Sequence, residues 1–133
     1  MVLIAVAVAS ANDAGFMQAI VEAQGEVTRN VAEIRNASLK YNAETNTYLA
    51  AGGAVRAYGE LTPTPHAWVG GERWNKLGWK PAGKLRSAYW VTTSGMDFTV
   101  HGVIDADGDG CAFEVVASAT TEPTPVPGTL ACW

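Results

Sequence analysis

The N-terminal third of the chain changes from an uninterrupted apolar run into a one-sided helical pattern, and this change limits the possible folds more than any other feature. Residues 1–11 read MVLIAVAVASA, whereas a helix needs about 20 apolar residues to span a bilayer. The run lacks the basic start of a signal peptide, although its last three residues, Ala-Ser-Ala, fit a cleavage pattern. It is either a trimmed signal peptide, with the mature chain starting near Asn12, or the start of a longer apolar helix. The pattern that follows favours the longer helix.

An amphipathic helix is predicted after a short polar interruption at Asn12, Asp13 and Gly15. Apolar side chains then recur by threes, fours and one seven, which places them on one helical face: Phe16, Ile20, Ala23, Val27, Val31, Ile34 and Tyr41. The helix is expected to end near residues 42–46. An ordinary core helix explains residues 27–41, but the residues before 27 are still more apolar. We therefore expect that earlier part to be covered by something outside the domain.

Three strand candidates follow in the C-terminal half, at Ser87–Thr92, Asp97–Ile104 and Ala112–Ala119. Because short turns at residues 93–96 and 105–110 connect them, the strands should form an antiparallel meander. One apolar face of such a sheet needs a cover, and the helical stripe supplies it. The expected fold class is α+β, with a long N-terminal α-helix packed on a C-terminal antiparallel β-meander.

The chain is expected to divide into a helical part, residues 1–47, and a globular β domain, residues 48–133. Within the helical part, an apolar assembly segment covers about residues 1–27, and an amphipathic segment covers about residues 16–44. Residues 48–86 form a long connection, which burial is expected to anchor through three tryptophans: Trp68, Trp74 and Trp79. Residues 120–127 alternate proline with other residues and predict a stiff, extended loop.

Composition and motifs argue against an enzyme or a nucleic-acid-binding protein. The 133 residues suit about one domain, and nine basic residues against thirteen acidic ones leave a net charge of -4. Non-specific binding to nucleic acid needs clustered basic residues, and only residues 73–86 hold a modest group. His66 and His101 stand alone in the sequence, with no nucleophile signature and no phosphate-binding glycine loop. We therefore predict no catalytic residues and no required cofactor.

Four segments in order resemble the type IV pilin family. Residues 31–48 read VAEIRNASLKYNAETNTY and look like the end of the pilin helix. Residues 74–83, WNKLGWKPAG, are similar to the segment W-x-x-L-G-[FW]-x-P-x-G of that family. The tripeptide YWV at 89–91 and the stretch DFTVHGVIDADGDG at 97–110 look like the strands and Asp-Gly turn that follow. The resemblance covers about residues 16–117.

The resemblance implies a structural subunit of an extracellular, bacterial cell-surface filament that serves adhesion, motility or surface interaction. Identical subunits would polymerise helically through the N-terminal helix, after transient membrane insertion and with the help of inner-membrane assembly machinery. The residues expected at the assembly interface are apolar and lie on both sides of the polar interruption: Val2, Leu3, Ile4, Val6, Val8, Phe16 and Ile20.

Two other functions remain open. A pseudopilin or minor pilin of a secretion or DNA-uptake machine shares the pilin fold but forms short, transient assemblies. A monomeric extracellular binding module, dependent on Ca²⁺, would instead lose residues 1–11 as a signal peptide.

An acidic turn between the second and third predicted strands is the candidate metal site. Asp105, Asp107 and Asp109 alternate and precede Gly110, and carboxylates at this spacing can surround Ca²⁺. The first half matches an EF-hand loop, but Val116 stands at its twelfth position and the flanks read as strands. The turn is therefore either a weak extracellular Ca²⁺ site or a hairpin turn in which aspartates cap local N–H groups.

Cys111 and Cys132 are the only cysteines. In an exported protein an even, widely spaced pair suggests a disulfide, which here would close a C-terminal loop over residues 111–132. The alternative is two buried thiols in a cytosolic protein. Redox catalysis is disfavoured because the sequence has no C-x-x-C motif.

Overall fold

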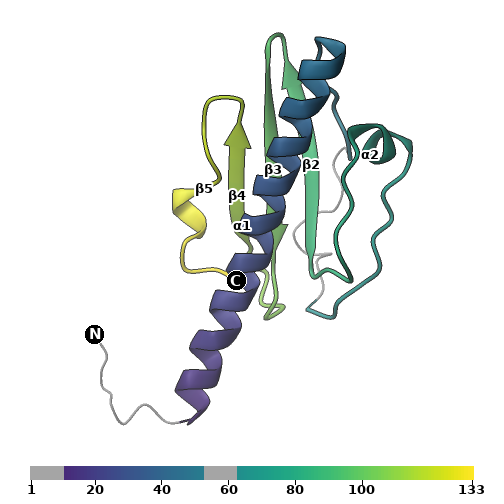
Figure 1. Ribbon diagram of the computed structural model, residues 1–133. Helices are drawn as coiled ribbons and strands as arrows, with labels where there is room; N and C mark the ends of the chain where they lie inside the picture. Colours follow the sequence, from purple (N-terminus) through teal and green to yellow (C-terminus); the bar gives the residue numbers. More distant parts are fainter. Residues whose placement is uncertain (1–10, 53–62) are drawn as a thin grey trace.

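The protein folds as one long helix laid across a four-stranded antiparallel sheet (Figure 1). The computed structural model describes residues 11–52 and 63–133. The α+β fold class is therefore confirmed. The sequence-based interpretation of residues 1–10 lies outside the described residues.

Helix α1 spans Ala11–Thr45, and it runs without a break through the polar interruption. The sequence favoured a helix that continues from the apolar run into the amphipathic stretch, and Asn12, Asp13 and Gly15 are all helical. A glycine costs a helix only about 1 kcal/mol relative to alanine, which a helix of 35 residues tolerates. The predicted C-terminal end is confirmed: the next residue, Asn46, takes a left-handed conformation with φ 63°, one that asparagine adopts more readily than most residues.

The sheet has the order β2-β3-β4-β5, with each neighbouring pair antiparallel. Its long strands are β2 (Ser87–Ser94), β3 (Asp97–Ile104) and β4 (Phe113–Ser118). The predicted meander is thus correct, with β2 two residues longer and β4 one residue shorter at each end. The short strand β5 (Thr124–Pro125) falls in the segment predicted as an extended loop, and it is followed by the 3-10 helix η2 (Pro127–Thr129).

Helix α1 and the sheet share one hydrophobic core. The predicted helical stripe supplies four fully buried side chains: Ala23, Val27, Val31 and Ile34. They face alternate residues of β3 and β4: Phe98, Val100, Ile104, Phe113, Val115 and Ala117. Gly102 of β3 lies beneath the helix, where an added Cβ would come within 2.6 Å of Val31 Cγ2. The lack of a side chain at Gly102 therefore sets how closely the helix approaches the sheet.

Buried polar contacts fix the position of α1 along strand β2. Glu26 Oε2 accepts hydrogen bonds from the backbone N–H of Arg86 at 2.9 Å and from Ser87 Oγ at 2.5 Å. Asn30 Nδ2 donates to the hydroxyl of Tyr89 at 3.1 Å. Burial raises the pKa of that hydroxyl, so it stays protonated. Each bond satisfies a group that would be costly to bury alone, so a register shift of the helix is disfavoured.

The connection before β2 carries helix α2 (Glu72–Leu77), which the sequence did not reveal. The predicted anchoring by burial is confirmed: Trp74 and Trp79 are buried, and Trp68 is partly buried. The three rings pack on one another with centroids 5.1 to 5.7 Å apart. Trp79 also donates its Nε1–H to Glu33 Oε1 of α1 at 3.0 Å, which ties the connection to the helix.

Candidate functional site

The first turns of α1 extend beyond the ends of the strands of the sheet (Figure 1). Three large apolar side chains of this part are exposed: Phe16 at 54%, Met17 at 58% and Val21 at 62%. Ile20, predicted at the interface, is partly buried. The other predicted interface residues, Val2, Leu3, Ile4, Val6 and Val8, lie outside the described residues. From Ala23 onward the apolar stripe of the helix is buried against the sheet, so the exposed large apolar side chains of α1 lie before that residue.

The C-terminal residues 126–133, which we call the strap, lie against this part of α1. Gln24 Nε2 donates to the backbone carbonyls of Cys132 at 3.0 Å and Leu130 at 3.4 Å. The ring of Trp133 meets the ring of Phe16 edge-on, with centroids 5.1 Å apart. The sequence interpretation missed these contacts, because they join residues more than a hundred positions apart and no spacing pattern signals them.

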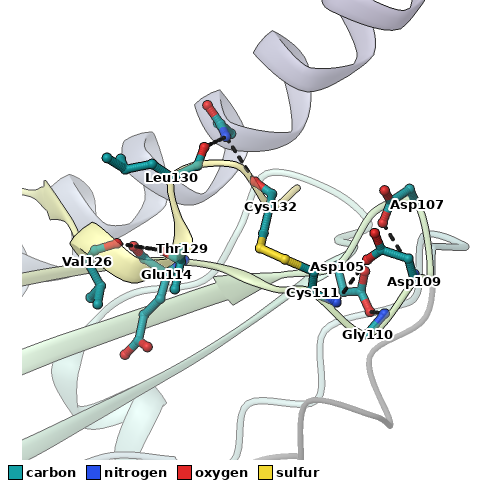
Figure 2. The surroundings of a disulfide bond; sticks show 11 residues. Asp105, Asp107, Asp109, Gly110, Cys111, Glu114, Val126, Thr129, Leu130 and Cys132 are labelled. Atoms are coloured by element: carbon teal, nitrogen blue, oxygen red, sulfur yellow. Dashed lines mark hydrogen bonds between the residues drawn. A yellow bond between two sulfur atoms is a disulfide. The ribbon is translucent and has the colours of Figure 1, made fainter.

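A disulfide joins Cys111, just before β4, to Cys132 of the strap (Figure 2). The two Cα atoms lie 5.2 Å apart, inside the usual range for a disulfide. The predicted pairing is therefore present. It fastens the strap to the sheet, while Gln24 fastens it to the helix.

The acidic turn lies beside this disulfide, and its three carboxylates face one another (Figure 2). Carboxylate oxygens of Asp105, Asp107 and Asp109 all lie within 4.8 Å of one another. Each aspartate also caps a local N–H: Asp105 Oδ2 accepts from Gly110 at 2.9 Å, and Asp109 Oδ1 accepts from Cys111 at 2.8 Å. Asp107 Oδ1 accepts from the N–H of Asp109 at 3.3 Å. The capping role predicted for a hairpin turn is thus present.

The pKa values of the two exposed carboxyls of the turn, Asp107 and Asp109, shift in opposite directions. Partial burial and a hydrogen bond with Asp109 raise the pKa of Asp107. The N–H of Cys111 lowers the pKa of Asp109. Two carboxylates at this distance disfavour simultaneous ionisation, and a cation would relieve that repulsion.

Asp105 is the feature of the turn that local capping does not explain. The residue is 2% exposed, and its Oδ1 is buried with no hydrogen-bond partner. Leaving a buried polar oxygen without a hydrogen-bond partner costs about 1 to 3 kcal/mol. Together the three carboxylates supply hard oxygen ligands of the kind that Ca²⁺ prefers. The residues present therefore fit a Ca²⁺ ion at this end of the sheet.

The two histidines occupy packing positions in the described residues. The ring of His101 stacks on Trp90 at 4.7 Å, and its Nδ1 lies 3.4 Å from Glu114 Oε2. The backbone of His66 bridges to Leu85. The expectation of no catalytic residues stays a prediction.

Comparison of the chain with family models, with curated proteins and with solved structures finds no match. Within residues 11–52 and 63–133, no helix combines the length and the apolar character needed to cross a bilayer. The resemblance to pilins thus rests on the sequence segments given above.

Proposed function

We propose that this protein is a structural subunit that polymerises through the N-terminal part of α1 into a filament of identical copies. The observation that carries the proposal is the first turns of α1, which extend past the sheet and expose Phe16, Met17 and Val21. Fully burying one such side chain contributes about 1.5 to 3 kcal/mol. Repeated along an assembly, this surface favours association over a dispersed monomer.

The pilin resemblance supports the finer form of the proposal. In that form the filament is extracellular, stands on a bacterial surface and serves adhesion, motility or surface interaction. Membrane insertion and inner-membrane machinery would precede its assembly. A pseudopilin or minor pilin would use the same surface but form short assemblies, which electron micrographs of purified protein distinguish from long filaments.

Removing residues 1–18 is expected to convert the assembling protein into a soluble monomer. The cut precedes Ala23 and Gln24, so the core and the Gln24 hydrogen bonds to the strap remain, while the ring contact of Phe16 with Trp133 is lost. Light scattering after size exclusion gives the mass, and far-UV circular dichroism checks that the shortened chain is folded. Filaments formed by the folded, shortened chain would contradict the proposal.

A single substitution tests the same surface without shortening the chain. Val21→Glu is expected to reduce the sedimenting fraction, since it places a charge within the exposed part of α1. Val69→Glu is the matched control, because Val69 is a valine that is 88% exposed and lies outside α1.

We also propose that the acidic turn binds Ca²⁺ weakly, on the evidence of the buried, unpaired Oδ1 of Asp105. Asp105, Asp107 and Asp109 would hold the ion, and it would supply the positive charge that the turn lacks. Extracellular modules of this kind bind Ca²⁺ with dissociation constants of about 10⁻⁴ to 10⁻³ M. Such a site also suits the alternative function, a monomeric Ca²⁺-dependent binding module.

Ca²⁺ at 10 mM is expected to raise the melting temperature by roughly 10 °C relative to EDTA. That concentration is about 100 times a dissociation constant of 10⁻⁴ M and stabilises by about 2.7 kcal/mol. The shift should shrink as pH falls through the raised pKa of Asp107, because protons then compete with the ion. The double variant Asp107→Asn, Asp109→Asn should lose the shift, and Glu72→Gln, at an exposed position of α2, should keep it. Equal melting temperatures in EDTA and Ca²⁺ would leave only the capping role.

A further inference from the structure

The acidic turn and the disulfide share a short stretch of chain. Cys111 follows the turn directly, and its N–H donates to Asp109 Oδ1 at 2.8 Å (Figure 2). The bridge then leads from Cys111 to Cys132 of the strap. A proposed Ca²⁺ ligand is thus hydrogen-bonded to a bridged cysteine, and the position of Asp109 depends on where the strap holds Cys111.

A second contact joins the strap to the middle of the turn. The N–H of Asp107 donates to the carbonyl of Trp133 at 3.4 Å, and Trp133 follows Cys132 directly. The strap is itself anchored to α1, where Gln24 Nε2 donates to the carbonyl of Cys132 at 3.0 Å. With the bridge in place, the strap therefore positions two of the three aspartates of the turn.

Asp105, in contrast, is held by the sheet. It follows β3 directly and is 2% exposed, whereas residues 107–111 are all exposed. Its Oδ2 accepts from the N–H of Gly110 at 2.9 Å, and its buried Oδ1 has no hydrogen-bond partner. Burial fixes this ligand. The other two aspartates have no burial to fix them, so they depend on local capping and on the strap.

Holding the three carboxylates together without an ion is unfavourable. Oxygens of all three lie within 4.8 Å of one another, and like charges repel. A turn that is free to relax spends less time with its ligands assembled, and the apparent dissociation constant rises as the binding-competent fraction falls. A restraint that keeps Asp107 and Asp109 beside Asp105 therefore strengthens Ca²⁺ binding without adding a ligand.

We infer that the bridge between Cys111 and Cys132 controls the affinity of the acidic turn for Ca²⁺, and that reduction of the bridge weakens binding about tenfold. The inference rests on the proposed Ca²⁺ site and adds its regulation by thiol chemistry. Coupling between two sites is reciprocal, so bound Ca²⁺ makes the bridge harder to reduce by the same factor. The turn is thus a Ca²⁺ site for oxidising surroundings, in which the bridge persists.

The reductant in this scheme is an external dithiol. One of its sulfurs attacks a sulfur of the bridge as a thiolate, the bond between the two cysteine sulfurs breaks, and a mixed disulfide forms. The second sulfur of the dithiol then displaces the protein sulfur and closes the disulfide of the reagent. Two electrons pass to the protein, and the two cysteine sulfurs take up the two protons that the dithiol loses. The covalent link between turn and strap is lost, while every carboxylate of the turn remains.

NMR titration with CaCl₂ measures the coupling. The amide signals of residues 105–111 in ¹⁵N-labelled protein give the dissociation constant, and the spread of the whole spectrum shows whether each variant is folded. The double variant Cys111→Ser, Cys132→Ser is expected to have a dissociation constant about tenfold larger than that of the bridged parent. The matched control is Ile34→Ala, which weakens the core at a buried residue of α1 about 15 Å along the helix from Gln24. This control should bind Ca²⁺ as the parent does.

The outcomes separate the inference from the proposal on which it rests. Equal dissociation constants for the bridged parent and the folded double variant would overturn the inference and leave the Ca²⁺ site standing. An equal loss of affinity in Ile34→Ala would also overturn it, since general destabilisation would then be the cause. If the bridged parent does not bind Ca²⁺, the inference and the proposed Ca²⁺ site are both wrong, and the proposed filament is unaffected.

A second measurement needs no cysteine variant. The parent is equilibrated in buffers with set ratios of reduced to oxidised dithiothreitol, in EDTA or in saturating Ca²⁺, and the quenched samples are alkylated for mass spectrometry. Ca²⁺ is expected to raise the ratio that reduces half of the protein about tenfold. The double variant Asp107→Asn, Asp109→Asn should abolish this rise. The same midpoint in EDTA and in Ca²⁺ would overturn the inference, even if the double serine variant did not fold.

Discussion

Replacing Cys111 and Cys132 together with serine is expected to lower the free energy of unfolding by about 3 kcal/mol. The bridge closes a loop of 21 residues, and in the chain-entropy model a loop of this size restricts the unfolded chain by about that amount. For a domain of this length the melting temperature should fall by roughly 10 °C. Chemical denaturation followed by tryptophan fluorescence measures the change.

The structure also predicts where the effect appears. Without the bridge, the strap is held by hydrogen bonds and by the ring contact with Phe16. Its hydrogen-bond partners are Gln24, Asp107 and Glu114 of β4. Hydrogen exchange should therefore quicken in residues 126–133 and leave β3 unchanged. The parent protein under reductant serves as the control, and it should match the double variant. A loss of stability under 1 kcal/mol would contradict the loop-closure argument.

Gly102→Ala is expected to lower the free energy of unfolding by roughly 2 to 3 kcal/mol, although it adds one methyl group. That Cβ would lie 2.6 Å from Val31 Cγ2 and 2.8 Å from Tyr89 Cε1, both in the packed core. Overpacking of a core costs about 1 to 3 kcal/mol, and here it pushes α1 away from β3. Urea denaturation of parent and variant gives the difference directly.

Two further variants make this measurement specific. Gly83→Ala is the control, since a Cβ there meets nothing within 4 Å, and the change should be within about 0.5 kcal/mol. Val31→Ala removes the nearest clashing methyl, so the double variant with Gly102→Ala should be more stable than the sum of the single effects. Strict additivity would show that Val31 and Gly102 are not in contact.

Local periodicity was sufficient to predict the helix and the three long strands. The spacing of Val27, Val31 and Ile34 is a property of the helix itself, and the alternation of Phe98 and Val100 is a property of the strand. Neither depends on distant residues. The polar residues at Asn12–Gly15 do not interrupt α1, because they disfavour a helix only slightly and act on a few turns of a long one.

The missed elements depend on contacts that a sequence pattern does not contain. Helix α2 has six residues, too few for an apolar pattern with a helical period to be recognised. The strand pairing of β5 covers two residues. Leu130 and Trp133 carry no motif, and they lie near α1 because the disulfide and Gln24 hold the strap there. For the acidic turn, the spacing indicated that the carboxylates would be close. Only the structure shows that the oxygen without a partner belongs to Asp105.

The two edges of the sheet bear on the tendency of this protein to aggregate at high concentration. On one side β5 pairs over two residues, one of them Pro125, which has no N–H to offer another strand. On the other side Val91 of β2 is already engaged by Ala51, through backbone hydrogen bonds of 2.8 and 3.1 Å. Edges shortened or occupied in this way resist the strand-to-strand addition that leads to amyloid. Growth through the proposed assembly surface of α1 would therefore meet little competition from strand-to-strand addition at the edges of the sheet.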